Sequence, residues 1–252
     1  MNYQGILVVR TDIEGIPSII MRHRDRKGKY PTVIFYHGWT SSKDAQSFRG
    51  FILASLGYQV ILPDSIFHGE RGSIDYGSKE NAGVFWEVVL KNLEESDILI
   101  ETLIRKFDAD KSRIALSGHS MGGFTSTGIF AQNPVPKTLI VLNGSGCWEK
   151  SNDIFVEKLG IIETERFKEL RVRIGEKDPI GRRDILVDRP ILILHGEDDT
   201  VVDIGPQREF YESLKSSYSR KDLIMMTTYK QLDHYVTTNM MEEMGRWLEK
   251  YL

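Results

Sequence analysis

The sequence predicts an α/β protein with a doubly wound, mainly parallel sheet. Short apolar runs without polar alternation are typical of strands covered on both faces, and most are separated by segments with helical spacing. The runs are residues 33–36, 60–62, 114–116, 138–142, 191–194 and 223–226. This alternation favours a parallel sheet with right-handed crossovers. A length of 252 residues fits one such domain, so we expect residues 1–252 to form a single unit.

The first strands in the chain form a different pattern. Residues 6–9 and 19–21 are strand-like but too close together for a helical crossover, which predicts an antiparallel hairpin at one edge of the sheet. The basic segment 22–29 follows this hairpin, and we interpret it as a solvated loop.

Five amphipathic segments are predicted as helices. They are residues 44–56, 79–107, 121–132, 204–217 and 236–252. In the first of them, Ala45, Phe48, Ile52 and Leu56 recur at helical spacing, which predicts that these four side chains face the sheet.

Residues 144–189 interrupt the alternation, because they separate two strands by more than a usual connection. Helical patterns at 154–159 and 163–172 favour a small helical cap inserted over the sheet. A long peripheral excursion is the alternative.

A serine after the third parallel run gives the strongest chemical signal. Ser120 lies in GHSMGG at residues 118–123, between an apolar run and a helical pattern. A tight strand-to-helix turn holds a serine in strained backbone angles, and glycines two positions away on either side avoid collisions. A phosphate-binding turn is the alternative, but neither a P-loop lysine nor G-x-G-x-x-G is present. The sequence therefore predicts a nucleophile elbow.

With this elbow, the sequence resembles the α/β-hydrolase superfamily. Within it, the chain is most similar to small bacterial carboxylesterases related to dienelactone hydrolases and to prolyl oligopeptidase catalytic domains. The resemblance covers nearly the whole chain and is most specific at HGW (37–39), the elbow, and HGEDD (195–199). It implies the α/β-hydrolase fold and a triad in the order nucleophile, acid, histidine.

The resemblance places the acid of the triad after the run at 191–194. The family pattern H-G-x-x-D-x-x-V matches His195, Gly196, Asp199 and Val202. Asp199 is therefore expected to fix the tautomer of the base and to stabilise the imidazolium. Asp198 is the alternative, and we interpret it as a solvated loop carboxylate.

His234 is the expected base. Of the six histidines, it alone lies between the last apolar run and the final helical pattern. Family members often carry glycine just before this histidine, whereas this chain has Asp233. That difference weakens the local match but does not change the position of His234 in the chain.

The resemblance also assigns the oxyanion hole to the backbone N–H groups of Trp39 and Met121. Such donors stabilise charge that appears on the carbonyl oxygen in the transition state. The chain has one H-G pair at 37–38 and no H-G-G-G, which disfavours lipases with a glycine-rich oxyanion loop.

Five further residues are expected around the substrate. They are His119, Phe67, Glu70, Arg71 and Trp148. Glu70 and Arg71 either bind a polar substrate group or tie their loop down, and we favour the second. Four aromatic side chains either line an apolar pocket for the acyl or alcohol group or pack within the fold: Trp39, Phe67, Trp86 and Trp148.

Composition excludes several other classes. The net charge of −3 and the absence of a long Lys/Arg cluster argue against nucleic acid, and no apolar stretch is long enough to span a membrane. The lone Cys147 fits a reducing compartment, and residues 1–5 do not begin a signal peptide, so we expect a cytoplasmic protein. No spacing of His, Cys and carboxylates predicts a metal, and no cofactor is expected.

The expected function is hydrolysis of carboxylic esters of small molecules through an acyl-enzyme intermediate. Two alternatives use the same fold. One is hydrolysis of thioesters or peptide-like amides by the same triad. The other is a non-catalytic binding protein, a class that typically lacks a triad member. The oligomeric state and the acyl and alcohol groups are left open.

Overall fold

A single eight-stranded sheet organises the chain in a computed structural model that describes residues 5–78, 81, 83–162 and 164–252. The strands are β1 (Ile6–Ile13), β2 (Ile16–His23), β3 (Tyr30–Tyr36), β4 (Gln59–Pro63), β5 (Ala109–His119), β6 (Thr138–Leu142), β7 (Ile191–Gly196) and β8 (Ile224–Tyr229). Their order is β1-β2-β4-β3-β5-β6-β7-β8, and the six strands from β4 to β8 run parallel. The predicted α/β-hydrolase fold with a mainly parallel sheet is confirmed.

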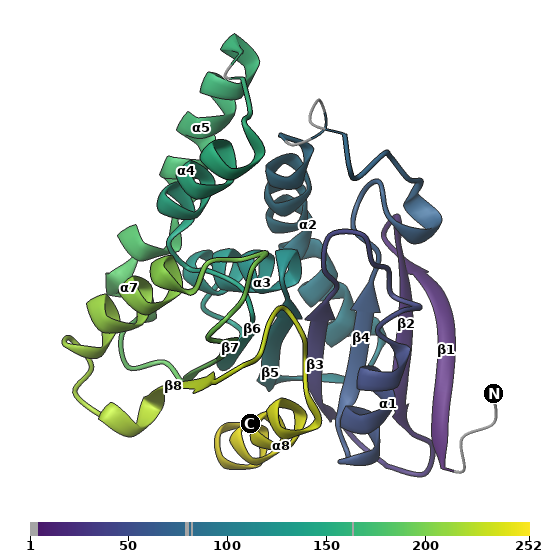
Figure 1. Cartoon of the computed structure of the whole chain (residues 1–252). Coiled ribbons are helices and arrows are strands. Elements are labelled where there is room, and N and C mark those ends of the chain that lie inside the picture. The colour runs from purple at the N-terminus through teal and green to yellow at the C-terminus, as the bar shows by residue number, and fades with distance from the viewer. Residues whose placement is uncertain (1–4, 79–80, 82, 163) are drawn as a thin grey trace.

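The predicted hairpin forms one edge of this sheet (Figure 1). β1 pairs antiparallel with β2, and the turn between them is Glu14-Gly15, in which both residues have positive φ, 54° and 85°. Two such residues are typical of the tight hairpin turn that matches strand twist. β2 then pairs antiparallel with β4, which joins the hairpin to the parallel strands.

Helices cover both faces of the sheet. They are α1 (Ser47–Ser55), α2 (Val84–Lys106), α3 (Met121–Gln132), α4 (Trp148–Leu159), α5 (Glu165–Lys177), α6 (Arg183–Leu186), α7 (Ile204–Lys215) and α8 (Thr238–Tyr251). α1 and α8 lie on one face, and α2 and α3 lie on the other (Figure 1). The predicted helix at 79–107 begins with residues 79, 80 and 82, which lie outside the described residues.

The buried face of α1 differs from the predicted one. Phe48 is 71% exposed and Leu56 is 55% exposed, whereas Gly50, Leu53 and Ala54 are buried. The reason is a close approach: a Cβ on Gly50 would lie 2.9 Å from a methyl group of a β4 leucine. Gly50 and Ala54 therefore bring this face of α1 onto the sheet. Of the predicted face, Ile52 is half-buried against the core, whereas Phe48 and Leu56 point outward.

The segment between β6 and β7 forms α4, α5, a 3₁₀ turn η3 (Pro179–Gly181) and α6. In Figure 1, α4 and α5 extend beyond the sheet as a pair. Asp178, at the end of α5, accepts hydrogen bonds from the backbone N–H groups of Trp148 (3.0 Å) and Glu149 (2.9 Å). This contact caps α4, which begins earlier than the predicted residue 154; residue 163 of the other predicted helix lies outside the described residues.

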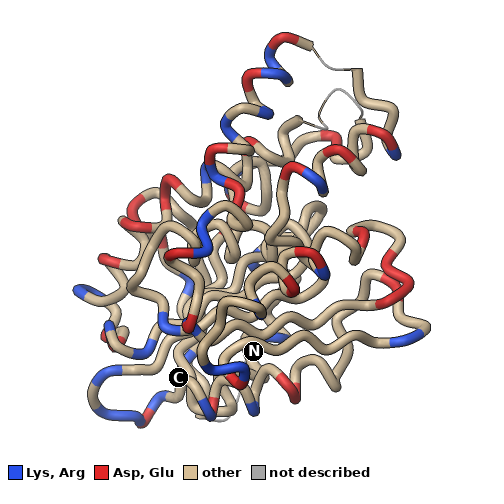
Figure 2. Tube along the Cα trace, turned by 90° about the vertical axis from the view of Figure 1, so that its left-hand side faces the viewer, with Lys and Arg blue, Asp and Glu red and all other residues tan. Residues whose placement is uncertain are grey.

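Charged residues of both signs are interspersed along the described chain (Figure 2). In the part of the chain that the structure describes, no helix combines the length and apolar character required to cross a membrane.

Candidate functional site

Ser120 lies on a sharp turn between β5 and α3. Its backbone angles are φ 56° and ψ −123°, a conformation that non-glycine residues adopt only with strain. Its backbone N–H donates to Leu142 O at 2.9 Å, which links the turn to the end of β6. The serine therefore stands at the carboxyl edge of the sheet, at the beginning of α3.

Two glycines make this turn possible. A Cβ on Gly118 would lie 2.2 Å from Gly122 O, and a Cβ on Gly122 would lie 2.0 Å from Tyr36 O. Both distances are far shorter than real Cβ contacts, so neither position has space for a side chain. This is the steric requirement from which the sequence predicted an elbow.

The loops after β7 and β8 bring Asp199 to His234. Nδ1 of His234 lies 2.7 Å from Asp199 Oδ2, and the Asp199 side chain is fully buried. The other carboxylate oxygen, Oδ1, accepts the backbone N–H groups of Val201 (2.9 Å) and Val202 (2.8 Å). Asp198, the alternative acid, is exposed. The contact predicted for Asp199 is present in the structure.

A second histidine also contacts Asp199. Nε2 of His195 lies 3.1 Å from Val202 O and 3.3 Å from Asp199 Oδ2. Both neighbours only accept hydrogen bonds, so this nitrogen carries the proton. Burial alone would raise the pKa of Asp199, but the hydrogen bonds from His195 and His234 outweigh burial and lower the pKa below its usual value. Asp199 is therefore a carboxylate at neutral pH.

The acid loop and the base loop are also joined beside the Asp199 contact. Asp233 Oδ1 accepts the backbone N–H of Thr200 at 2.7 Å and that of His234 at 2.8 Å. Asn143, at the end of β6, accepts the N–H of Gly196 at 3.0 Å and donates to Tyr235 O at 3.0 Å. These contacts fix the relative position of the two loops, and sequence inspection did not identify them.

The elbow and the base lie at the same edge of the sheet. The ring of His119, the residue before Ser120, packs on the ring of His234 with centroids 4.7 Å apart. Burial lowers the pKa of His119 to about 3, so this neighbour is neutral at pH 7. Among the described residues, no hydrogen bond joins Ser120 Oγ to His234; in free enzymes such contacts are often long and shorten when substrate binds.

The loop after β3 lies against the elbow. A Cβ on Gly38 would lie 3.3 Å from Ser120 Cβ, which places the following residue, Trp39, next to the serine. Within the described residues, no hydrogen bond uses the backbone N–H of Trp39 or of Met121. Both predicted oxyanion donors are therefore free to bind a ligand.

Buried polar contacts anchor this oxyanion loop. Nδ1 of His37 donates to Gly38 O at 2.8 Å, and Nε2 accepts the backbone N–H of Ser65 at 3.1 Å. The ammonium of Lys43 pairs with the carboxylate of Asp64, and the two side chains are 1% and 0% exposed. The His37–Ser65 hydrogen bond and the Lys43–Asp64 ion pair join the loop after β3 to the loop after β4.

A cavity of about 410 Å³ opens beside Ser120. Its wall includes Trp39, Phe85, Trp86 and Phe155, which come from the oxyanion loop, α2 and α4. The volume is in the range of small-molecule sites. Of the tryptophans considered for an apolar pocket, Trp39 and Trp86 line this cavity.

None of the five residues expected around the substrate is among the described residues that line this cavity; His119 instead packs on His234. Arg71 forms two 2.7 Å contacts with Glu95, and Glu70 pairs with Lys43 at 2.7 Å, so both hold their loop in place. Trp148 is fully buried and packs against α3, where its ring occupies the space beside a glycine. Phe67 is half-exposed and is not part of the cavity wall.

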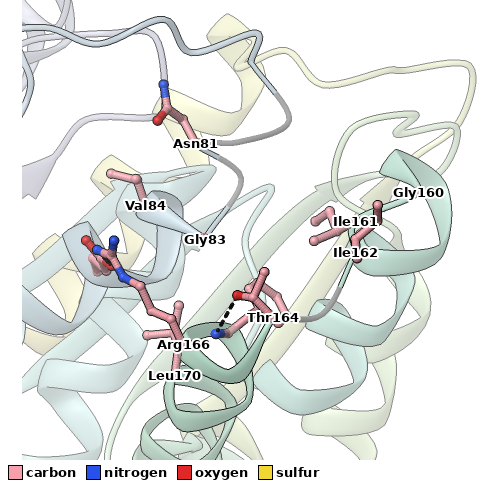
Figure 3. A pocket seen from close by; sticks show the side chains of 11 residues that line it. Asn81, Gly83, Val84, Gly160, Ile161, Ile162, Thr164, Arg166 and Leu170 are labelled. Atoms are coloured by element: carbon pink, nitrogen blue, oxygen red, sulfur yellow. Dashed lines mark hydrogen bonds and ion pairs between the residues drawn. The ribbon is translucent and has the colours of Figure 1, made fainter.

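A second cavity, of about 360 Å³, lies between the beginning of α2 and the α4–α5 connection (Figure 3). It shares Ile161 and Phe167 with the first cavity but does not reach Ser120. Of the described residues that line it, two are charged, Glu87 and Arg166, and they pair with each other at 2.6 Å. No group of three or more His, Cys, Asp or Glu side chains in the described part of the chain could hold a metal ion.

Comparison with known proteins identifies the family. The family model described as the prolyl oligopeptidase family matches residues 45–252. The chain belongs to this family. This prolyl oligopeptidase family protein is 31% identical to YitV of Bacillus subtilis, which carries an esterase name, over 98% of this chain and 100% of YitV. It is 28% identical to the esterase YjfP of Escherichia coli over 88% of this chain and 89% of YjfP.

The fold of this family member is found among solved structures as well. TT1662 from Thermus thermophilus matches it with a TM-score of 0.82 at 20% identity, over 97% of each chain. At that level of identity the likeness concerns the fold. The family expected from the three motifs is confirmed.

Proposed function

We propose that this protein hydrolyses carboxylic esters of small molecules through an acyl-enzyme intermediate. The 2.7 Å contact between Asp199 and His234, at the same sheet edge as the Ser120 elbow, carries the proposal. The esterase names of YitV and YjfP support an ester as the substrate. The hydrogen bonds of Asp233 and Asn143, which hold the loops after β7 and β8 together, support a preorganised base.

In the proposed acylation step, Nε2 of His234 takes the proton of Ser120 Oγ as this oxygen attacks the ester carbonyl. Asp199 accepts the Nδ1–H of His234, which fixes the tautomer and stabilises the imidazolium. The backbone N–H groups of Trp39 and Met121 donate to the oxyanion. Collapse of the tetrahedral intermediate breaks the bond to the alcohol oxygen, which takes the proton from His234.

In the proposed deacylation step, His234 removes a proton from water as the water oxygen attacks the acyl carbon. The bond to Ser120 then breaks, the serine regains its proton and the carboxylic acid leaves. We also propose that residues 144–189 act as the cap of this site, because Asn152 and Phe155 of α4 form part of the cavity wall.

Replacement of Ser120 by alanine tests the nucleophile. We expect Ser120→Ala to remain folded and to lose at least about 10³-fold in kcat on a chromogenic ester, because no other hydroxyl stands on the elbow. A fluorophosphonate should form one covalent adduct on the unmodified protein, which peptide mass mapping should place at Ser120. The variant should form none.

Ser55, which lies on α1 and is exposed, gives a matched control. Ser55→Ala should keep both turnover and adduct formation. Wild-type turnover in Ser120→Ala, or an adduct mapped to another residue, would overturn the proposed nucleophile.

A further inference from the structure

The cavity beside Ser120 has an aromatic wall. Phe85 is at its centre, with ring centroids 5.9 Å from Trp39, 5.2 Å from Trp86 and 5.6 Å from Phe155. Edge-to-face and tilted rings at these distances form a stable apolar surface. The group that binds here would therefore contact carbon on several sides.

The polar atoms of these rings are already bonded within the protein. The indole N–H of Trp39 donates to Tyr76 O at 3.2 Å, and that of Trp86 donates to Asn152 Oδ1 at 2.8 Å. The hydroxyl of Tyr76 donates to Phe67 O at 2.7 Å. A polar substituent placed against these rings would lose its hydrogen bonds to water without gaining equivalent ones.

The described part of the wall also carries little formal charge. Among the described residues that line the cavity there is no Asp or Glu, and Lys158 is the one side chain with a formal charge. Lys158 is exposed, and its ammonium donates to Thr200 O at 2.8 Å. An ammonium group on a substrate would therefore enter this cavity without a counter-charge, at a large desolvation cost.

We infer that this cavity binds an uncharged, apolar, ring-sized group on one side of the scissile ester, and that Phe85 and Phe155 determine the selectivity. The inference rests on the proposed function and names its substrate class. It excludes esters of free α-amino acids as preferred substrates. The ring belongs either to the acyl group or to the alcohol group of the ester, and the experiment below distinguishes these two cases.

A panel of matched esters tests the substrate class. The acyl arm compares ethyl 3-phenylpropanoate with ethyl acetate, and the alcohol arm compares benzyl acetate with ethyl acetate. We expect kcat/KM to be at least about 10-fold higher for the ring-bearing ester in one arm, the discrimination typical of an apolar pocket. Ethyl phenylalaninate differs from ethyl 3-phenylpropanoate by its amino group, and we expect it to be at least about 10-fold poorer.

Substitution of the wall tests the assignment to this cavity. Phe155→Ala should lower the ratio of kcat/KM between the preferred ring-bearing ester and ethyl acetate by about 10-fold. Phe155→Leu keeps most of the apolar volume and should lower it less, and it decides the question if the alanine variant does not fold. Phe48→Ala, on the exposed face of α1, is the matched control and should leave the ratio unchanged.

Three results would overturn the inference: equal rates across both arms, a preference for the amino ester, or a ratio unaffected by both Phe155 substitutions. Each of these is compatible with an active serine esterase. A protein that forms no fluorophosphonate adduct and cleaves no ester would instead contradict the proposed function, so the two failures are distinguishable.

Discussion

Two adjacent carboxylates show how strongly a single residue depends on its surroundings. Asp199 is buried and accepts from His234 and from two backbone N–H groups, whereas Asp198 is exposed. The hydrogen bonds lower the pKa of Asp199, so its charge is present throughout the neutral range. The two residues have the same side chain and opposite environments, which makes them a matched pair.

We expect Asp199→Asn to lower kcat by about 10⁴-fold, because an amide cannot hold the tautomer of His234 in which Nδ1 carries the proton. Asp198→Asn should change kcat by less than about 2-fold, because it touches neither the base nor the cavity. Steady-state kinetics on one chromogenic ester would measure both. Similar losses in the two variants would refute the assignment of the acid.

The residues that could be predicted from sequence are those with a strong local pattern. Ser120 is recognisable from its flanking glycines, and Asp199 from its spacing to His195. The anchors of the site have no such pattern, because their partners are far apart in the chain. Lys43 meets Asp64 across 21 positions, and Asn152 meets Trp86 across 66.

At the scale of elements, close packing between α3 and the sheet positions the elbow. Gly122 faces Tyr36 O so closely that an added Cβ would lie 2.0 Å away. On the same helix, a Cβ on Gly123 would lie 3.0 Å from Gly144 Cα, near the end of β6. The beginning of α3 therefore packs backbone against backbone at the strand ends. This close approach fixes the position of Ser120.

Gly122→Ala should lower the free energy of unfolding by about 3 kcal/mol or more, because a rigid backbone carbonyl occupies the space of the new methyl group. Gly181, in η3, is a matched control: a Cβ there has no neighbour within 4 Å. Gly181→Ala should change the free energy by less than about 0.5 kcal/mol. Urea unfolding measures both, and equal stabilities would show that α3 has room to move.

Element positions were predictable where apolar runs are long, and less so where contacts between elements decide. β5 begins at Ala109, five residues before the predicted run, because Ala109 pairs with Tyr30 ahead of a register shift that leaves the polar residues 110–113 out of the β3–β5 pairing. The face of α1 was predicted wrongly because Gly50, which has no side chain, sets the approach to the sheet. α4 begins at Trp148 because Asp178, 30 residues later, caps it.

Across the whole molecule, buried neutral histidines make stability depend on pH. Burial lowers the pKa of His37 from 6.5 to about 4 and that of His119 to about 3. Between about pH 4 and 6.5 the unfolded chain therefore binds protons that the folded chain does not bind. By linkage, the stability present above pH 6.5 is lost as the pH falls through this window.

We expect the free energy of unfolding to fall between pH 7 and pH 5, with about 2 kcal/mol of the loss due to His37. His37→Gln keeps an acceptor for the N–H of Ser65 and should reduce the fall. His23→Gln replaces an exposed histidine and should not. Urea titrations at the two pH values give the comparison, and an unchanged fall in His37→Gln would refute the role of this imidazole.

The Lys43–Asp64 pair has a consequence for how the protein responds to ionic strength. Dissolved counterions cannot approach an ammonium and a carboxylate that are 1% and 0% exposed, so they screen this attraction little. The neighbouring pair of Arg10 and Asp44 has side chains 58% and 50% exposed, and added electrolyte weakens such a pair. The loop that carries Trp39 should therefore remain anchored at molar salt concentrations, whereas exposed ion pairs on the surrounding surface are weakened.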